Sequence, residues 1–272
     1  MINQLKYELS ILLKRDKFSK LLLFETSIIA IYCIIFLVGK NASFYGNKFD
    51  FYFLLNHNHV TISYCIILIV PILSTIAHGD VGYQEDTMKY SVISRCGSNK
   101  YYSARRIMIF LVGFFNILYV LEILYIFQYV ALDIDLTYYY TGNDGILLYL
   151  IPNNDVPFFS FLYNHPFIYF QMYILIISIF GGFSSLLTYE LDQLFHNHST
   201  MYVNGFLVIL AISFVMIFSG KYQMWSYFFL LTPNIWGITS DVFVCVGWII
   251  WCIIFFLIIM LIIIFKNKIN NE

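Results

Sequence analysis

Residues 243–265 read FVCVGWIIWCIIFFLIIMLIIIF, an apolar run that contains no charged side chain. A helix needs about 20 apolar residues to cross a hydrocarbon core that is ~30 Å thick. The run therefore predicts a transmembrane helix near the C-terminus. Comparable runs lie at residues 21–39, 60–78, 107–130, 167–189 and 201–219. The pattern predicts an all-α fold, a polytopic membrane protein with six transmembrane helices.

The overall composition supports a membrane protein. Of the 272 residues, 60% are hydrophobic and only 11% are charged, whereas soluble domains carry about 25% charged residues. In hydrocarbon, only helices and closed barrels satisfy every backbone polar group. Long apolar runs, rather than alternating strands of roughly ten residues, favour helices. No separable soluble domain is evident, so residues 1–272 are expected to form a single transmembrane domain.

The distribution of Lys and Arg predicts the orientation. Twelve of the 15 Lys and Arg residues lie in the N-terminal segment 1–20, in the loop 79–106 and in the tail after the last apolar run. Because cytoplasmic loops are enriched in Lys and Arg, these three segments and both termini are expected in the cytoplasm. A multi-pass protein of the cell membrane follows. The richness in Ile, Asn, Lys, Tyr and Phe is typical of an AT-rich genome, such as that of a low-GC Gram-positive bacterium.

Three segments outside the apolar runs have a distinctive amino-acid composition. Residues 1–20 combine apolar residues at helical spacing with basic residues, which predicts an interfacial helix; the alternative is a cytosolic leader without membrane contact. Residues 131–166 form a long outer loop rich in Tyr and Pro. Residues 220–242 are too short to span and too apolar for water, which predicts a re-entrant or interfacial segment.

The stretch 79–106, GDVGYQEDTMKYSVISRCGSNKYYSARR, is rich in charged residues and separates two apolar runs. Its acids Glu85 and Asp86 suit the first turn of a short helix over residues 84–95, because they complement the positive end of the helix dipole. Gly97 is suited to the position just after a helix end, and Ser98 can cap the helix that follows. Two interpretations remain open. The stretch is either a solvated loop that fixes orientation or a docking element for a cytosolic partner.

The order of these elements resembles that of the permease subunits of ABC-2 type ABC transporters. An N-terminal amphipathic helix, six spans, a cytoplasmic coupling helix between spans two and three, and a re-entrant element before the last span are shared. The local sequence is similar to that of small Gram-positive export permeases in four short pieces, which are Gly82-Tyr83-Gln84-Glu85, Ser94-Arg95-Cys96-Gly97-Ser98, Tyr101-Tyr102 and Ala104-Arg105-Arg106. One departure is the loop 131–166, which is longer than the family pattern.

The resemblance implies a function for the chain. It would be the transmembrane permease subunit of an ATP-driven exporter for an amphipathic or hydrophobic substrate, such as a peptide antibiotic, a bacteriocin-like peptide or a drug. The coupling helix would dock on a separate ABC ATPase through side chains spread over the short helix, which are Glu85, Asp86, Met88, Tyr90, Val92 and Arg95. A second permease copy or a paralogue, and membrane lipids, are the other expected partners, and no nucleic acid is expected.

The chain lacks the GxxxxGK[ST] sequence of a P-loop. We therefore expect that it is not an enzyme, that it has no catalytic residue or cofactor, and that ATP and Mg²⁺ bind the partner subunit. Two other classes of function are alternatives. One is a membrane immunity protein that binds a peptide without transporting it. The other is an intramembrane enzyme, for which neither GxSxG nor HExxH is present.

A few polar residues lie within the apolar runs, where ionisable groups are functional candidates by default. Glu25 lies close to Lys20, so an interfacial salt bridge is one explanation for it. Asn116 and Glu122 are candidates for a substrate path, with a helix interface as the alternative.

Gly181 and Gly182 allow either close packing or bending. The scattered cysteines and the two His-Asn-rich groups lack metal-ligand spacing, so no metal site is expected.

Overall fold

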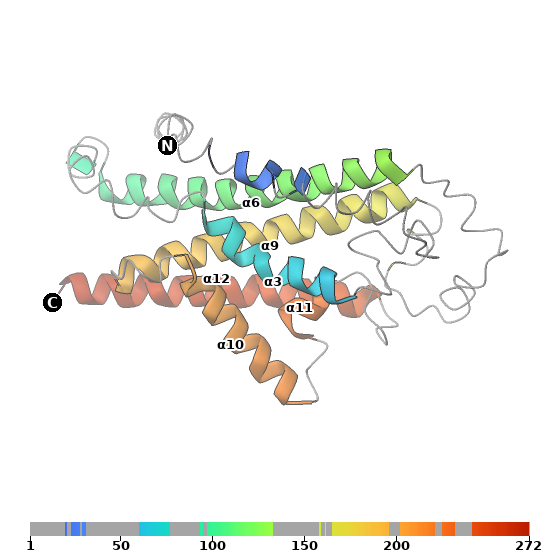
Figure 1. Cartoon of the computed structure of the whole chain (residues 1–272). Coiled ribbons are helices and arrows are strands. Elements are labelled where there is room, and N and C mark those ends of the chain that lie inside the picture. The colour runs from blue at the N-terminus through green and yellow to red at the C-terminus, as the bar shows by residue number, and fades with distance from the viewer. Residues whose placement is uncertain are drawn as a thin grey trace.

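The structure is a computed structural model, and it describes 12 ranges or single positions of the chain. These are residues 20, 23–27, 29–30, 60–76, 93–94, 97–132, 158, 161, 165–195, 202–220, 225–231 and 241–271. Within these ranges the chain forms helices and turns, and no strand occurs. The helices are α3 (Val60–Ile76), α6 (Ser98–Leu132), α9 (Pro166–Phe195), α10 (Asn204–Phe218), α11 (Tyr227–Leu230) and α12 (Asp241–Asn271) (Figure 1). The predicted all-helical class is confirmed for this part of the chain.

Among the described residues, three helices are long and apolar enough to cross a membrane. The spanning candidates are Ser98–Ile126 in α6, Phe167–Phe195 in α9 and Asp241–Lys268 in α12. Two shorter apolar helical segments, Ile67–Ile76 and Asn204–Phe218, coincide with the second and fifth predicted runs. The chain is accordingly described as a helical membrane protein.

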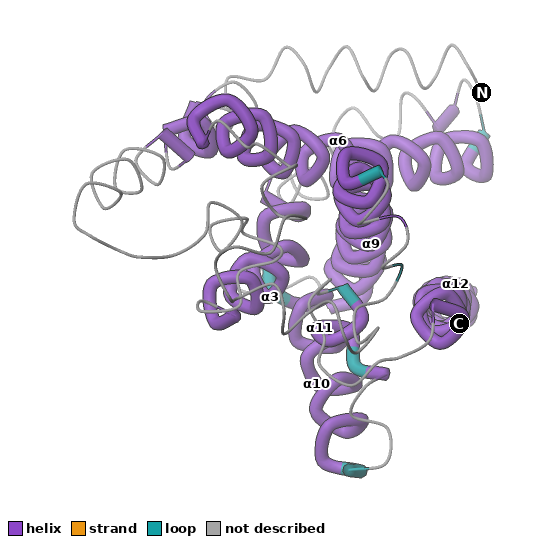
Figure 2. The backbone as a smooth tube through the Cα atoms, turned by 90° about the vertical axis from the view of Figure 1, so that its right-hand side faces the viewer, coloured by secondary structure: helices purple, strands orange, loops and turns teal. Residues whose placement is uncertain are grey.

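Helix α9 is the centre of the bundle. Helices α3, α6, α10 and α12 all pack against it, and Figure 2 shows them arranged around it. Side chains on several sides of α9 are buried, among them Tyr169, Ile174, Phe180, Leu187 and Glu190. A helix that is enclosed on several sides has little contact with lipid, so its sequence is constrained by its neighbours.

Small residues let α6 and α9 approach closely. A Cβ added at Gly113 would lie 2.4 Å from the Cβ of Ser185, and one added at Gly181 would lie 2.7 Å from a side-chain carbon of Ile117. A Cβ at Gly182 would meet Phe110 at 2.8 Å. Close approach through small residues is a standard way to pack helices in membranes. The packing interpretation of Gly181 and Gly182 is therefore confirmed.

An aromatic cluster joins α9, α11 and α12. The ring of Tyr227 lies 5.5 Å from Trp251 and 5.7 Å from Phe180 in edge-to-face geometry. The indole N–H groups of Trp248 and Trp251 donate to the backbone carbonyls of Leu230 and Trp225, at 2.9 and 2.8 Å. Residues 225–231, which include the short helix α11, are thus anchored on α12.

Several helix ends differ from the predicted runs. Helix α6 begins at Ser98 and ends at Leu132, beyond both ends of the predicted span 107–130. Helix α9 continues to Phe195, six residues beyond the end of the predicted span 167–189. Apolar runs mark only the part of a helix that suits hydrocarbon. A helix continues beyond that part wherever its polar side chains find partners.

Helices α6 and α9 run antiparallel, whereas α12 runs parallel to α9, with Trp248 beside Tyr173 near their starts and Lys266 beside Gln193 near their ends. The start of α6 lies beside the end of α9, and the start of α9 lies beside the later half of α6. We call the end of the bundle that contains Ser98 and Phe195 the basic end. Its described cations on α6 and α12 are Lys100, Arg105, Arg106, Lys266 and Lys268.

Candidate functional site

The predicted docking side chains lie outside the described residues. They are Glu85, Asp86, Met88, Tyr90, Val92 and Arg95. In the segment that leads to α6, the structure describes Ile93, Ser94 and Gly97. The junction with α6 can therefore be described, whereas the predicted docking contacts remain a prediction.

At that junction, Gly97 ends one helical turn and starts the next helix. Its φ is +82°, in the left-handed region that glycine adopts without strain. Its N–H donates to the carbonyl of Ile93 at 2.8 Å, the bond expected for a glycine just after a helix end. Its own carbonyl accepts from the N–H of Tyr101 at 3.2 Å. The predicted role of Gly97 is confirmed. The prediction that Ser98 is the cap was wrong, because Ser98 is already the first residue of α6 and Gly97 accepts the first bond.

At the basic end, an ion pair joins α6 to α9. Nε of Arg106 donates to Oε1 of Glu190 at 2.6 Å, and the Glu190 side chain is fully buried. A buried carboxylate is stable only where a cation and hydrogen bonds compensate for lost water. Arg106 supplies the cation and one hydrogen bond, to Oε1, while Oε2 accepts none from the described residues. The pair ties the start of α6 to the end of α9.

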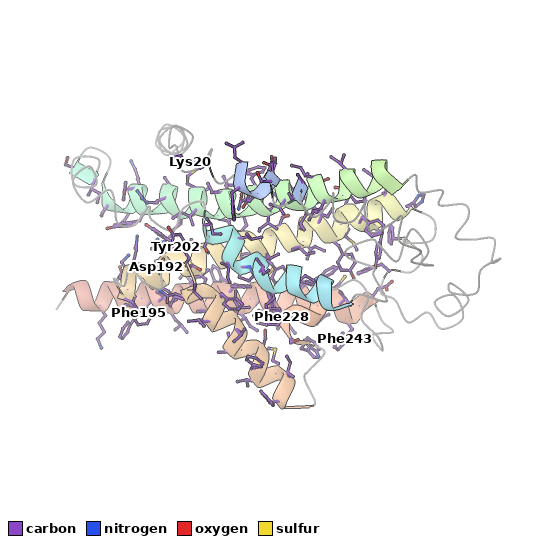
Figure 3. All side chains as sticks on the ribbon, viewed as in Figure 1. Lys20, Asp192, Phe195, Tyr202, Phe228 and Phe243 are labelled. Atoms are coloured by element: carbon purple, nitrogen blue, oxygen red, sulfur yellow. The ribbon has the colours of Figure 1, made fainter. Side chains whose placement is uncertain are left out.

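Further polar contacts at the basic end involve α3, α10 and α12. Asp192 accepts a hydrogen bond from the amide of Asn204 at 2.7 Å, and the hydroxyl of Thr75 donates to the carbonyl of Tyr202 at 2.9 Å. Figure 3 labels Asp192 and Tyr202 in this region. Lys266 of α12 donates to Gln193 and lies 5.1 Å from the ring centre of Tyr102. The basic end is thus a polar network that ties five helices together.

Halfway along α6, a second polar cluster is buried among apolar side chains. Nδ2 of Asn116 donates to Oε1 of Glu25 and to the carbonyl oxygen of Leu73, each at 3.0 Å. The Glu25 and Asn116 side chains are 3% and 4% exposed. The predicted salt bridge of Glu25 with Lys20 was wrong. Glu25 turns into the bundle and meets Asn116, whereas Lys20 is exposed.

Glu122 lies apart from that cluster. Its Oε2 accepts a hydrogen bond from Nε2 of Gln171 on α9, at 3.2 Å. Positions six apart on a helix point in different directions, about 120° from one another. Asn116 therefore faces Glu25 and α3, while Glu122 faces α9. The structure does not bring the two candidates for a substrate path together, and their role in a path stays a prediction.

Metal-ligand geometry is not found in the described residues. No group of three or more His, Cys, Asp or Glu side chains gathers there. The two cysteines for which the structure gives a state, Cys245 and Cys252, are free thiols on α12.

The partners of the buried polar groups could not be read from the sequence, although one signal was present. No Lys or Arg occurs between Ile107 and Gly220, so a buried Glu190 has no cation nearby in the chain. The nearest cations at the same end of a helical bundle are those at the start of the preceding span. This signal points to Arg105 and Arg106, and Arg106 is the partner. No comparable signal exists for Gln171 with Glu122.

Comparison with known proteins does not place the chain in a family. No family model matches it, and no curated protein or solved structure is significantly similar to it.

Proposed function

We propose that the chain is the transmembrane permease subunit of an ATP-driven exporter of ABC-2 type, in which a separate ABC ATPase supplies the energy. In this proposal the membrane domain has six spans and both termini are cytoplasmic. The substrate class is an amphipathic or hydrophobic molecule. The basic end is the cytoplasmic end, because Lys and Arg are enriched on that side of membrane proteins.

The observation that carries the proposal is the junction at Gly97. A single left-handed residue joins the helical turn at Ile93 to a helix of 35 residues. A connection this short allows little independent movement of the two helical segments that it joins. A displacement of the segment before Gly97 would therefore pass directly into α6, which is the mechanical property that a coupling element requires.

The contacts of α6 support transmission beyond that helix. Arg106 is bonded to Glu190 at the basic end, and Gly113 packs against Ser185 and Gly181 further along. These contacts lie on one side of α6, facing α9. Since α9 also contacts α3, α10 and α12, a movement of α6 would reach the whole bundle through α9.

The experiment that tests this proposal separates docking from transmission. The tagged full chain is purified from its own cells, any ABC ATPase that copurifies is identified by its P-loop, and the pair is reconstituted in liposomes. We expect vanadate-sensitive ATP hydrolysis. Two glycines inserted between Gly97 and Ser98 should reduce transport to the background level while the complex still assembles, because slack at the junction absorbs the displacement.

The matched control is Gly97→Asn. Asparagine tolerates the left-handed conformation better than other residues with a side chain, so this variant should keep transport. The proposal is wrong if no ABC ATPase copurifies, or if the two-glycine insertion transports as well as the wild type.

A further inference from the structure

The Glu25–Asn116 cluster contains two buried oxygen atoms that lack a partner. Oε2 of Glu25 and Oδ1 of Asn116 accept no hydrogen bond from any described residue. Leaving a buried polar atom without a partner costs about 1–3 kcal/mol, and more for a charged group. Both atoms belong to the same bonded pair of side chains, so their lack of partners calls for a common explanation.

The orientation of the Asn116 amide is fixed by its neighbours. The carbonyl oxygen of Leu73 can only accept a hydrogen bond, so the NH₂ group of Asn116 must face it. The same NH₂ group donates to Oε1 of Glu25, and both of its hydrogens are then used. Oδ1 of Asn116 is consequently left as an acceptor that needs a donor.

The charge of Glu25 also lacks compensation. An ionised carboxylate inside an apolar region requires a cation or several donors. Asn116 provides one hydrogen bond, and no ammonium or guanidinium group pairs with Glu25 in the part of the chain that the structure describes.

The other charged side chains on the packed helices are occupied or face elsewhere. Those of α6 and α9 are in the pairs Arg105–Tyr101, Arg106–Glu190, Gln171–Glu122 and Asn204–Asp192. Lys100 lies at the start of α6, in the first turn. Helix α3 has no charged residue. On the segment that carries Glu25, Lys20 is exposed.

We propose that Glu25 is a proton-binding site in which Oε2 carries the proton and donates it to Oδ1 of Asn116. A carboxylic acid and a primary amide are complementary, since each has one donor and one acceptor on the facing edge. One proton thereby satisfies both unpartnered oxygens and removes the uncompensated charge. A metal cation fits less well, because Oε1 of Glu25 and the Leu73 carbonyl already accept from the amide.

The site links proton binding to helix packing. Glu25 belongs to the segment before α3, while Asn116 lies on α6. If the segment that carries Glu25 separates from α6, the acid loses its amide partner and can release the proton to water. The inference does not depend on the proposed transport function, because it concerns only the packed state of these helices.

Infrared spectroscopy of the full chain in lipid at neutral pH tests the proposal. A neutral carboxylic acid has a carbonyl band that is separate from the carboxylate bands. We expect this band to be present in the wild type and lost in Glu25→Gln. The matched control, Glu122→Gln, should leave the band in place. If Glu25→Gln removes carboxylate intensity and leaves the acid band unchanged, the proposal is wrong.

Two further measurements use the hydrogen-bond partner and the stability. In Asn116→Leu the acid band should shift, because its O–H loses the amide acceptor; a folded variant with an unshifted band contradicts the assigned pairing. Glu25→Gln can make both hydrogen bonds to Asn116, so its thermal unfolding midpoint should equal or exceed that of the wild type. A lower midpoint would indicate that the packed state uses the charge of Glu25, which also overturns the proposal.

Discussion

Helices α9 and α12 are both long and apolar enough to cross a membrane, but their surroundings are opposite. In the most apolar window of α9, 61% of the residues are buried inside the protein, whereas in that of α12 only 22% are. Helix α9 carries two Gly, three Ser, one Thr and two acidic residues, whereas residues 248–265 of α12 are Ile, Leu, Phe and Trp with one Cys and one Met. In lipid, apolarity therefore does not mark the inside of the protein.

The physical reason is that lipid tails are as apolar as leucine. Burying an apolar side chain against another helix gains little over leaving it in lipid, so helix contacts depend on close packing and on hydrogen bonds. α9 follows this rule on the faces that meet α6 and α10, where Ser184, Ser185 and Thr188 are buried. On α12 the inward face is a single stripe, formed by Trp251, Phe255, Ile259 and Ile262.

The largest effect is expected where α9 and α6 approach most closely. In Gly113→Val the added side chain would collide with Ser185 and approach the carbonyl oxygen of Gly181, which a Cβ would meet at 3.2 Å. Overpacking of this kind costs about 3 kcal/mol or more when backbone limits the relaxation. The unfolding midpoint of the purified protein, followed by tryptophan fluorescence, should fall sharply.

The control for this substitution is Gly220→Asn. A Cβ at Gly220 meets nothing within 4 Å, and its φ is +63°, a conformation that asparagine tolerates. Its midpoint should stay close to that of the wild type. A Gly113→Val protein as stable as the control would contradict the close contact between α6 and α9.

A smaller effect is expected from the ion pair at the basic end. Arg106→Met leaves the carboxylate of Glu190 buried without a cation, and we expect a loss of about 2 kcal/mol, because Arg106 is partly exposed and water compensates in part. The double variant Arg106→Met/Glu190→Gln removes the charge as well and should recover most of this stability. A double-mutant cycle on unfolding midpoints measures the coupling, and additive single effects would mean that the two side chains are not paired.

The sequence could predict those features of the fold that depend on the local properties of the chain. The apolar runs located α3, α6, α9, α10 and α12, because hydrocarbon demands long apolar stretches. Gly97 was predictable because the left-handed helix end is a local property of a few residues. Both are features of the chain that do not depend on how helices are rotated against each other.

The pairing of side chains was not predictable in the same way. Asn116 and Glu25 are 91 positions apart, and Arg106 and Glu190 are 84 apart. Their meeting depends on the rotation and register of the helices, and an apolar run that is similar on all sides gives little information on either. The polar residues themselves were the useful signal, since they indicate which side of a helix faces inward.

The smallest effects should come from α12, where two isoleucines separate its inner and outer faces. Ile259 is 6% exposed and Ile253 is 51% exposed. Ile259→Val removes one buried methylene and should cost about 1 kcal/mol, while Ile253→Val should change stability by less than about 0.5 kcal/mol. The chemical change is identical in the two variants. A difference between their unfolding midpoints therefore reports only the position of the residue on α12. Equal unfolding midpoints for the two variants would mean that α12 has no distinct inner face, and the contrast with α9 would then be one of degree.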